Sequence, residues 1–339
     1  MSSMFIPKRV IFEEKALEYK LGEKLLKDFK EKLNVEIMYS KNGRITGIPG
    51  RDDIQKYLEG KNTLVVGVRK TLKFESCKPS AHYQLPIVSG CMGMCEYCYL
   101  NTQMGKKPYI KIHVNTDEIL NKAAQYIDER KPEITIFEGA ATSDPIPVEP
   151  YSNALKECIE YFGKRDKAYF RFVTKYTDID SLLPLNHNGK TTIRFSLNTD
   201  SVIKKFEHRT PNFNERLMAA KRVADSGYPI GLIIAPVFIY EDWQHEYYSI
   251  LQDIHNSLSG YNIKFEVISH RFTKRAKENI LNVFPKTMLP MDEEIRKFKF
   301  GQFGYGKYIY KDEDMTGLKE FFLNNISDLF GKESINYII

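Results

Sequence analysis

The sequence predicts an α/β protein built on a partial (β/α)6 barrel of the TIM type, with an N-terminal α/β layer and a C-terminal β-hairpin and helix. Three observations carry this prediction. The 339 residues suffice for one large domain with a smaller companion. Short β-branched apolar runs alternate with amphipathic stretches, the pattern of parallel strands joined by helices. Beyond about residue 270 the chain turns basic and rich in Gly and aromatic residues.

We therefore expect three segments. Residues 1–80 form a layer packed on the barrel, 81–271 form the barrel, and 272–339 form the C-terminal hairpin and helix. In the first segment, 16–33 has the Leu and Tyr spacing of an amphipathic helix, and 62–70 is a short β-rich run.

The barrel segment holds six apolar runs that we expect to be strands, at 83–88, 134–138, 169–174, 192–197, 229–237 and 262–268. Helices are expected between them at 116–131, 153–163, 214–227 and 244–258. Binding and catalytic residues of parallel sheets lie at the carboxyl ends of the strands, so the residues that follow each run are the site candidates. In the last segment, 296–314 predicts a β-hairpin and 317–331 an amphipathic helix.

Composition limits the class of protein. Lys and Arg number 50 against 44 Asp and Glu, and the net charge of +6 permits an anionic partner without requiring one. The longest apolar stretch, 230–240, falls short of the ~20 residues that span a bilayer, so no membrane contact is expected. The N-terminus lacks the apolar core of a secretion signal. The clustered cysteines suit metal-binding thiols in a reducing cytoplasm, which is the expected location.

The most informative stretch is "SGCMGMCEYCYL", which places Cys91, Cys95 and Cys98 in a loop after the first barrel strand. Three thiols cannot all pair as disulfides, so structural pairing explains them poorly and a metal, iron or zinc, explains them better. A redox pair is the other candidate. A structural zinc site would want a fourth ligand nearby, and no Cys or His follows until residue 113. Three thiolates on a [4Fe–4S] cluster leave one iron open for a ligand, which the spacing favours.

This spacing, with an aromatic residue before the last Cys and a repeated β/α chain around it, resembles the radical S-adenosylmethionine superfamily. Further blocks resemble the spore photoproduct lyase family within it, among them "TLVVGVRKTLKFES", "RFVTK", "NGKTTIRFSLN", "GLIIAPVFI", "HRFTK" and "GKYIY". The resemblance extends over nearly the whole chain.

The resemblance implies a DNA-repair lyase with two cofactors, a [4Fe–4S] cluster and S-adenosyl-L-methionine. In this family the cluster reduces S-adenosylmethionine to give a 5′-deoxyadenosyl radical. That radical takes hydrogen from C6 of 5-thyminyl-5,6-dihydrothymine, the spore photoproduct, which reverts to two thymines. The implied partners are double-stranded DNA that contains the lesion and an external one-electron reductant of the flavodoxin or ferredoxin type. The implied location is the cytoplasm of the spore core.

Position by position, the resemblance implies a set of S-adenosylmethionine contacts at strand ends. They are Tyr99, Ser143, Lys175, Ser196, Asn198 and Ala235. The chemistry agrees with these roles, because an ammonium suits a carboxylate and hydroxyl and amide groups suit ribose and amine groups. Taken alone, Lys175 is equally well read as a solvated lysine at a strand end.

The chain departs from the family at Ala141, where family members carry the cysteine that returns a hydrogen atom to the thymine radical. Either the chain is an engineered Cys→Ala variant or another thiol serves, and Cys77 is the candidate donor. A buried structural role is the alternative for Cys77 and the preferred reading for Cys158. The resemblance implies that Tyr97 and Tyr99 relay the hydrogen atom. Packing over the cluster is the alternative for Tyr97.

The hairpin and the residues after the last barrel strand are the expected DNA contacts, since an enzyme must extrude a lesion from the duplex to reach it. The set is His270, Arg271, Lys274, Gln302, Phe303, Tyr305 and Lys307, with Tyr308 for stacking and Arg296, Lys297 and Lys299 for phosphates. Gln302 replaces an Arg of the family. Phe298 and Phe300 are expected to pack inward, and a solvated hairpin without DNA contacts is the alternative.

Two other functions remain open from the sequence. One is a radical S-adenosylmethionine enzyme that acts on another nucleic-acid substrate. The other is a zinc-stabilised nucleic-acid-binding protein without catalysis, which would stay colourless on anaerobic reconstitution with iron.

Overall fold

The structure, a computed structural model, describes residues 4–33, 35–41, 43–301, 304 and 306–339. The chain forms two compact units. Unit 1 comprises residues 1–93 and 103–193, and unit 2 comprises residues 94–102 and 194–339. The predicted division at residues 80 and 271 remains a prediction.

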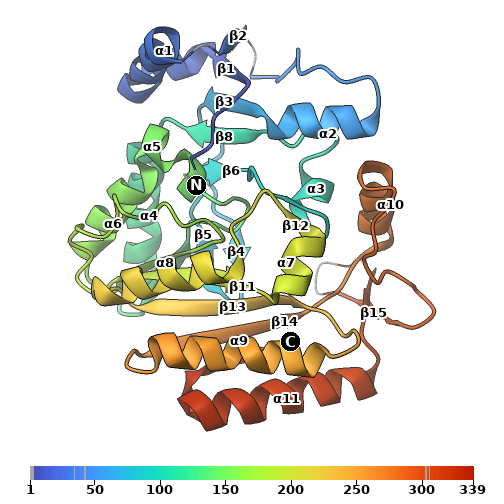
Figure 1. The fold of residues 1–339 in the computed structure, drawn as a ribbon. Helices are drawn as coiled ribbons and strands as arrows, with labels where there is room; N and C mark the ends of the chain where they lie inside the picture. Colours follow the sequence, from blue (N-terminus) through green and yellow to red (C-terminus); the bar gives the residue numbers. More distant parts are fainter. Residues whose placement is uncertain (1–3, 34, 42, 302–303, 305) are drawn as a thin grey trace. The chain divides into compact units, whose positions relative to one another are not determined.

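The N-terminal part of unit 1 is a sheet with the strand order β2-β1-β3-β8-β6 within the described residues (Figure 1). Its elements are β1 (Arg9–Glu13), the 3-10 helix η1 (Glu14–Glu18), α1 (Lys20–Lys32), β2 (Glu36–Ser40), α2 (Asp53–Lys61), β3 (Thr63–Gly67), β6 (Val88–Ser89) and β8 (Ile110–His113). β1 pairs in parallel with β2 and with β3. Both β1 and β3 are buried along their whole length, as expected for central strands of a parallel sheet.

This sheet is the predicted N-terminal α/β layer, and it reaches further along the chain than expected. β8 pairs in parallel with β3, with Leu64 opposite Ile110, although residues 110–113 were assigned to the barrel segment. The strand was missed because only four residues form it and a charged Lys111 interrupts its apolar pattern. The layer thereby joins the chain on either side of the cysteine loop.

The rest of unit 1 contains the first strand–helix repeats. Its elements are β4 (Ser76–Cys77), β5 (Ala81–Gln84), α4 (Thr116–Arg130), β9 (Thr135–Glu138), the 3-10 helix η2 (Ile146–Val148), α5 (Glu149–Ser152), α6 (Ala154–Gly163) and β10 (Ala168–Thr174). β9 pairs in parallel with β5 and with β10. The polar loop that follows β9 therefore starts at the carboxyl edge of these strands.

Unit 2 contains the remaining repeats and the C-terminal elements. They are β7 (Met94–Cys95), α3 (Leu100–Gln103, whose last residue belongs to unit 1), β11 (Thr191–Leu197, divided between the units), α7 (Asp200–Phe206), β12 (Glu207–His208), α8 (Phe213–Asp225), β13 (Ile230–Val237), α9 (Trp243–Leu258), β14 (Ile263–Ser269), α10 (Lys274–Val283), β15 (Lys297–Phe300), β16 (Gly306–Ile309), α11 (Asp312–Phe330), the 3-10 helix η3 (Lys332–Ser334) and β17 (Ile335–Ile338). β14 pairs in parallel with β13 and β17. Helices α9 and α11 lie side by side, with Trp243 against Phe321 (Figure 1).

Local sequence signals explain where the helices of unit 2 begin and end. Asn212 and Glu215 form a capping box at the start of α8. Gly227, at φ +81°, follows the last turn in a left-handed conformation that favours glycine. Thr199 caps α7 by accepting a hydrogen bond from the Val202 N–H. This cap fixes the turn that follows β11, where the candidate site residue Asn198 lies.

An apolar cluster forms the core of unit 2 on the side of β7, β12 and α7. Its buried members are Val202, Phe206, Phe238, Phe272, Ile280, Leu289 and Met291, and Tyr97, Tyr240, Phe284 and Tyr308 pack against it. Two candidate site residues, Tyr97 and Tyr308, thus pack against the same core. Their rings are consequently held in fixed positions.

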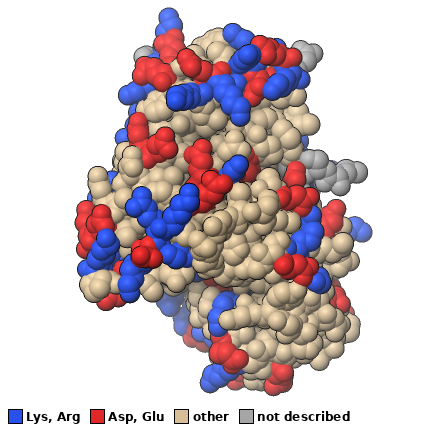
Figure 2. All heavy atoms as spheres, turned by 90° about the vertical axis from the view of Figure 1, so that its left-hand side faces the viewer, with Lys and Arg blue, Asp and Glu red and all other residues tan. Residues whose placement is uncertain are grey.

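The surface charge agrees with the modest excess of basic residues. On the face drawn in Figure 2, Lys and Arg side chains alternate with Asp and Glu and leave apolar or neutral areas between them. No helix of the described residues is long and apolar enough to cross a membrane.

Candidate active site

The cysteine loop is divided between the two units. Cys91 belongs to unit 1 and is half-buried, whereas Cys95 and Cys98 belong to unit 2. Cys95 lies in β7, which is held in place by antiparallel pairing with β12, Glu207 opposite Cys95. None of the three forms a disulfide. Among the described residues no group of three or more His, Cys, Asp or Glu is arranged to hold a metal ion, so the three-thiolate ligand set remains a prediction.

A buried lysine that sequence reasoning missed holds the start of this loop. Lys61, at the end of α2, is 1% exposed, and its ammonium donates to the carbonyl oxygens of Cys91 (2.9 Å) and Gly93 (2.7 Å). It also lies 5.4 Å from the ring centre of Tyr57. Gly93 N–H in turn donates to Cys91 Sγ at 3.3 Å. An N–H aimed at the sulfur favours its thiolate form.

Directly beside Cys91, the loop that follows β9 presents Ser143. Gly90 N–H donates to Thr142 O (2.9 Å) and Asp144 N–H donates to Gly90 O (3.3 Å), so this loop runs alongside the residue that precedes Cys91. Ser143 is 8% exposed and its hydroxyl has no hydrogen-bond partner within the structure. A buried hydroxyl without a partner costs free energy, and a bound polar ligand would remove that cost.

Asp144 orients the strand end that carries Lys175. Its carboxylate accepts from Thr174 Oγ1 (2.8 Å) and from the Lys175 N–H (2.9 Å). Burial raises the pKa of Asp144 to about 6, although these hydrogen bonds act in the opposite direction. Ser143 and Lys175, both predicted contacts of S-adenosylmethionine, are thus joined through one carboxylate. The sequence signal for Asp144 was its position directly after Ser143.

The segments that carry Cys77 and Ala141 are linked through Glu138. Ser80, in the turn after β4, donates to Glu138 Oε2 at 3.3 Å. Glu138 Oε1 accepts from the Ala140 N–H at 3.1 Å. Cys77 is half-buried and three residues from Ser80, and Ala141 is three residues from Glu138. The role of Cys77 as a hydrogen donor remains a prediction.

In unit 2, Tyr97 belongs to a buried hydrogen-bond network. Its hydroxyl donates to Glu207, whose second carboxylate oxygen pairs with Arg216 at 2.6 Å. Both side chains of this ion pair are 0% exposed. Arg216 also donates to Ser196 O at 3.0 Å. Burial, with the Glu207 charge as the second cause, raises the pKa of Tyr97 well above its usual value.

Glu207 and Arg216 are site residues that sequence reasoning missed. A signal for Arg216 existed, because it lies on the same face of α8 as the buried Ala220 and Val223. A cation on an apolar helix face needs a buried partner.

The other predicted contacts of unit 2 lie at the ends of β11 and β13. Asn198 is fully buried, and its amide donates to Pro236 O (2.8 Å), the residue after Ala235, while its oxygen accepts from Tyr247 OH (2.8 Å). The Asn198 side chain therefore fixes the backbone beside Ala235. Ala235 is half-buried and Ser196 is buried. Tyr99, beside the cysteine loop, is 53% exposed.

His270 is held inside the protein. It is 2% exposed, and Arg296 donates to its carbonyl oxygen (3.1 Å) and lies 3.2 Å from its Nδ1. Burial, together with the charges of Arg296 and Arg271, lowers the pKa of His270 to about 3. Arg296 is itself buried and lies 3.7 Å above the Tyr310 ring, so its expected contact with phosphate is not supported. Arg296 instead positions His270.

The hairpin β15–β16 forms as predicted, with Lys299 opposite Lys307. Phe298 and Phe300 are 50% and 71% exposed, so the expectation that they pack inward is wrong. A two-stranded ribbon has no second layer on which both faces can pack. Lys274 is exposed, Arg271 and Lys307 are half-buried, and burial lowers the pKa of Lys307. Gln302, Phe303 and Tyr305 lie outside the described residues.

Cys158 has the structural role expected of it. It lies on the buried face of α6 at 0% exposure, and burial raises the pKa of its thiol well above the usual value.

The residues present fit the cofactors that the sequence implies. The cysteine loop offers soft thiol donors without disulfides, and one of its sulfurs already accepts an N–H. The unpartnered Ser143 hydroxyl and the neighbouring Lys175 offer a donor and a cation to an amino-acid ligand.

Comparison with known proteins adds an independent observation. The family model described as "Spore photoproduct lyase" matches residues 5–339. A spore photoproduct lyase of Clostridium acetobutylicum is 60% identical over 339 residues, covering 100% of both chains, and one of Bacillus subtilis is 46% identical over 341 residues, covering 99% of both. A solved double mutant of spore photoproduct lyase with bound AdoMet and dinucleoside spore photoproduct matches with a TM-score of 0.95, at 45% identity and 99% coverage of both chains. This match confirms the predicted fold class.

Proposed function

Because the chain belongs to the spore photoproduct lyase family, we propose that it is a DNA-repair lyase that reverts 5-thyminyl-5,6-dihydrothymine to two thymines. The observation that carries the proposal is the full-length likeness to a lyase structure with both AdoMet and the dinucleoside lesion bound. The two chains are 45% identical over 99% of their lengths, so the likeness holds for the sequence as well as for the fold.

Cys91, Cys95 and Cys98 would hold a [4Fe–4S] cluster as thiolates. When bound, this cluster and S-adenosylmethionine supply a 5′-deoxyadenosyl radical that takes hydrogen from C6 of the lesion. The contribution of the chain is to hold the sulfurs. The Lys61 ammonium holds the carbonyl oxygens of Cys91 and Gly93, and β12 holds Cys95 by strand pairing. A loop fixed at both points loses little conformational entropy when its metal binds.

S-adenosylmethionine would contact Tyr99, Ser143, Lys175, Ser196, Asn198 and Ala235. Ser143 supplies the unpartnered hydroxyl, and Lys175 supplies a cation for the carboxylate. The Asn198 amide also donates to Pro236 O and accepts from Tyr247 OH, so it holds the backbone beside Ala235 in place.

Cys77 would return the hydrogen atom to the thymine radical, with Tyr97 and Tyr99 as the relay. The Glu138 link between the Cys77 and Ala141 segments supports this role for Cys77. Tyr97 suits a relay because its O–H proton is held at a defined atom of Glu207. Burial keeps the phenol protonated, which a hydrogen-atom donor requires.

The DNA strand would be held by Arg271, Lys274 and Lys307 through its phosphates, with Gln302, Phe303 and Tyr305 contacting the extruded lesion. His270 would face the lesion as a neutral ring, since its pKa lies far below neutrality. The proposed partners are double-stranded DNA with the lesion and a one-electron reductant of the flavodoxin or ferredoxin type. The proposed location is the cytoplasm of the spore core.

The test is an anaerobic assay of the iron-reconstituted protein on dinucleoside spore photoproduct with S-adenosylmethionine and a chemical reductant. We expect release of the repaired dinucleoside and formation of 5′-deoxyadenosine. Cleavage of S-adenosylmethionine without repair would indicate another substrate. A colourless protein that contains zinc would contradict the proposal as a whole.

A further inference from the structure

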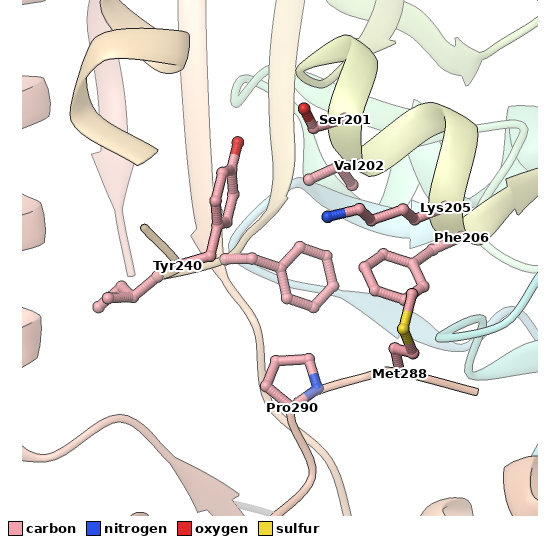
Figure 3. A pocket seen from close by; sticks show the side chains of 9 residues that line it. Ser201, Val202, Lys205, Phe206, Tyr240, Met288 and Pro290 are labelled. Atoms are coloured by element: carbon pink, nitrogen blue, oxygen red, sulfur yellow. The ribbon is translucent and has the colours of Figure 1, made fainter. Parts of the chain in front are cut away.

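Unit 2 contains a cavity of about 180 Å³ that the proposed reaction does not use. Three segments line it: α7 with Lys205 and Phe206, the residues after β13 with Phe238 and Tyr240, and the stretch that carries Met288 and Pro290 (Figure 3). Figure 3 shows Met288 and Pro290 on one side and Tyr240 on another, with Lys205 reaching across from α7.

The wall of the cavity is aromatic and rigid. The rings of Phe206 and Phe238 have centroids 5.4 Å apart and are 7% and 2% exposed. Tyr240 is fixed at its hydroxyl, which lies 2.9 Å from Thr199 Oγ1 and donates to Glu246 at 3.0 Å. Rings held in this way lose little entropy when they bind a flat apolar ligand.

The lining of the cavity includes one exposed cation. Lys205 is exposed and forms no hydrogen bond or ion pair among the described residues. Met288, another lining residue, is 71% exposed. A cavity lined by aromatic rings beside an unpaired ammonium group is complementary to a nucleobase with an attached phosphate.

The position of the cavity indicates which nucleotide it would take. The Phe238 ring also packs against Tyr97 (5.9 Å between centroids) and His270 (4.6 Å), both of which belong to the proposed reaction site. The cavity thus begins one aromatic ring away from residues assigned to the relay and to the lesion. If the lesion lies against Tyr97 and His270, an occupant of this cavity would lie next to the lesion.

We propose that this cavity binds the base of the undamaged nucleotide that adjoins the lesion, with Lys205 contacting its phosphate. The proposal rests on the proposed function and adds a subsite that selects lesions within a strand over the free dinucleoside. Met288 and Phe206 would contact the base from one side and Tyr240 from the other.

The test is fluorescence anisotropy of the protein with a labelled single-stranded oligonucleotide that contains one spore photoproduct. Two further oligonucleotides carry one abasic site each. It replaces the base on the 5′ side of the lesion in one of them and the base on the 3′ side in the other. For the unmodified protein, we expect one of the two replacements to weaken binding about ten-fold, which is the value of one stacked base. In the Met288→Ala variant the same replacement should cost less than about three-fold.

Lys205→Gln tests the phosphate contact. We expect the slope of log Kd against log salt to fall by about 0.7, the value for one contact on a single strand. Two surface variants serve as matched controls: Lys204→Gln, the adjacent exposed lysine outside the cavity wall, and Met218→Ala, a methionine of 69% exposure on α8. Neither control should alter the abasic effect or the salt slope.

The inference is overturned if neither abasic site weakens binding, or if the controls change the measurements as much as the cavity variants do. Repair of the dinucleoside by the unmodified protein, measured in parallel, tests the proposed function alone. If the protein repairs the dinucleoside but neither abasic site weakens binding, only the proposed subsite is overturned. If an abasic site weakens binding but the protein repairs no dinucleoside, only the proposed function is overturned.

Discussion

The buried ion pair between Glu207 and Arg216 should be essential for the stability of unit 2. In the Glu207→Gln variant, Arg216 keeps its charge and its contacts with Pro211 O (2.9 Å), Ser196 O (3.0 Å) and Thr210 Oγ1 (2.8 Å), but it loses its carboxylate. Leaving a charge unpaired inside a protein costs about 3–5 kcal/mol. Because three acceptors remain, we expect the lower end, about 3 kcal/mol.

The single tryptophan of the chain provides the assay. Trp243 is on α9 in unit 2 and packs against Tyr247 and Phe321, so its fluorescence reports the unfolding of this unit. With an m-value of about 3 kcal/mol/M, the expected loss of about 3 kcal/mol in unfolding free energy should lower the urea midpoint of Glu207→Gln by about 1 M. Lys221→Gln, which breaks the exposed ion pair with Asp225, is the control and should leave the midpoint unchanged. A shift of the Glu207→Gln midpoint no larger than that of the control would refute the reasoning.

Three further outcomes are expected. Cys77→Ala should change the product distribution of the repair reaction, because the thymine radical loses its hydrogen donor. The control Cys158→Ala should release thymine with the normal products. The same result for Cys77→Ala would remove Cys77 from the mechanism. Ser143→Ala should raise the urea midpoint of the ligand-free protein, because it removes a buried hydroxyl that has no partner among the described residues. It should also weaken S-adenosylmethionine binding about ten-fold in equilibrium dialysis, since a charged ligand loses one hydrogen bond; equal binding would show that the hydroxyl has no ligand. Burial raises the pKa of Glu149 to about 7, so its contribution to stability is complete below pH 4.5 and falls by about 3 kcal/mol as the pH rises to 7. The urea midpoint by circular dichroism should therefore fall less between pH 5 and pH 8 in Glu149→Gln, and parallel curves would contradict this.

The repeated strands and helices could be predicted because each carries a local signal. The strands expected at 134–138 and 229–237 appear as β9 and β13 within one residue, since their β-branched runs are buried on both faces. The helix expected at 244–258 appears as α9, whose apolar face follows the 3.6-residue period. Such patterns depend only on neighbours in the sequence.

The residues that position the site could not be predicted, because their partners are distant in the sequence. Lys61 reaches Cys91 across 30 residues, and Glu207 reaches Tyr97 across 110. An isolated Lys or Glu is most often solvated, so nothing in its own surroundings marks it as buried. Phe298 and Phe300 are the opposite case, because they are apolar residues that were expected to be buried and are exposed. Strand alternation indicates which side chains share a face, but not whether that face is covered.

The most direct test of the radical mechanism follows one hydrogen atom. Spore photoproduct dinucleoside labelled with deuterium at C6 is incubated with the iron-reconstituted protein, S-adenosylmethionine and reductant, and the 5′-deoxyadenosine is examined by mass spectrometry. Repair by a 5′-deoxyadenosyl radical predicts that deuterium appears in the 5′-deoxyadenosine. Repaired thymines accompanied by unlabelled 5′-deoxyadenosine, or no repair at all, would contradict it.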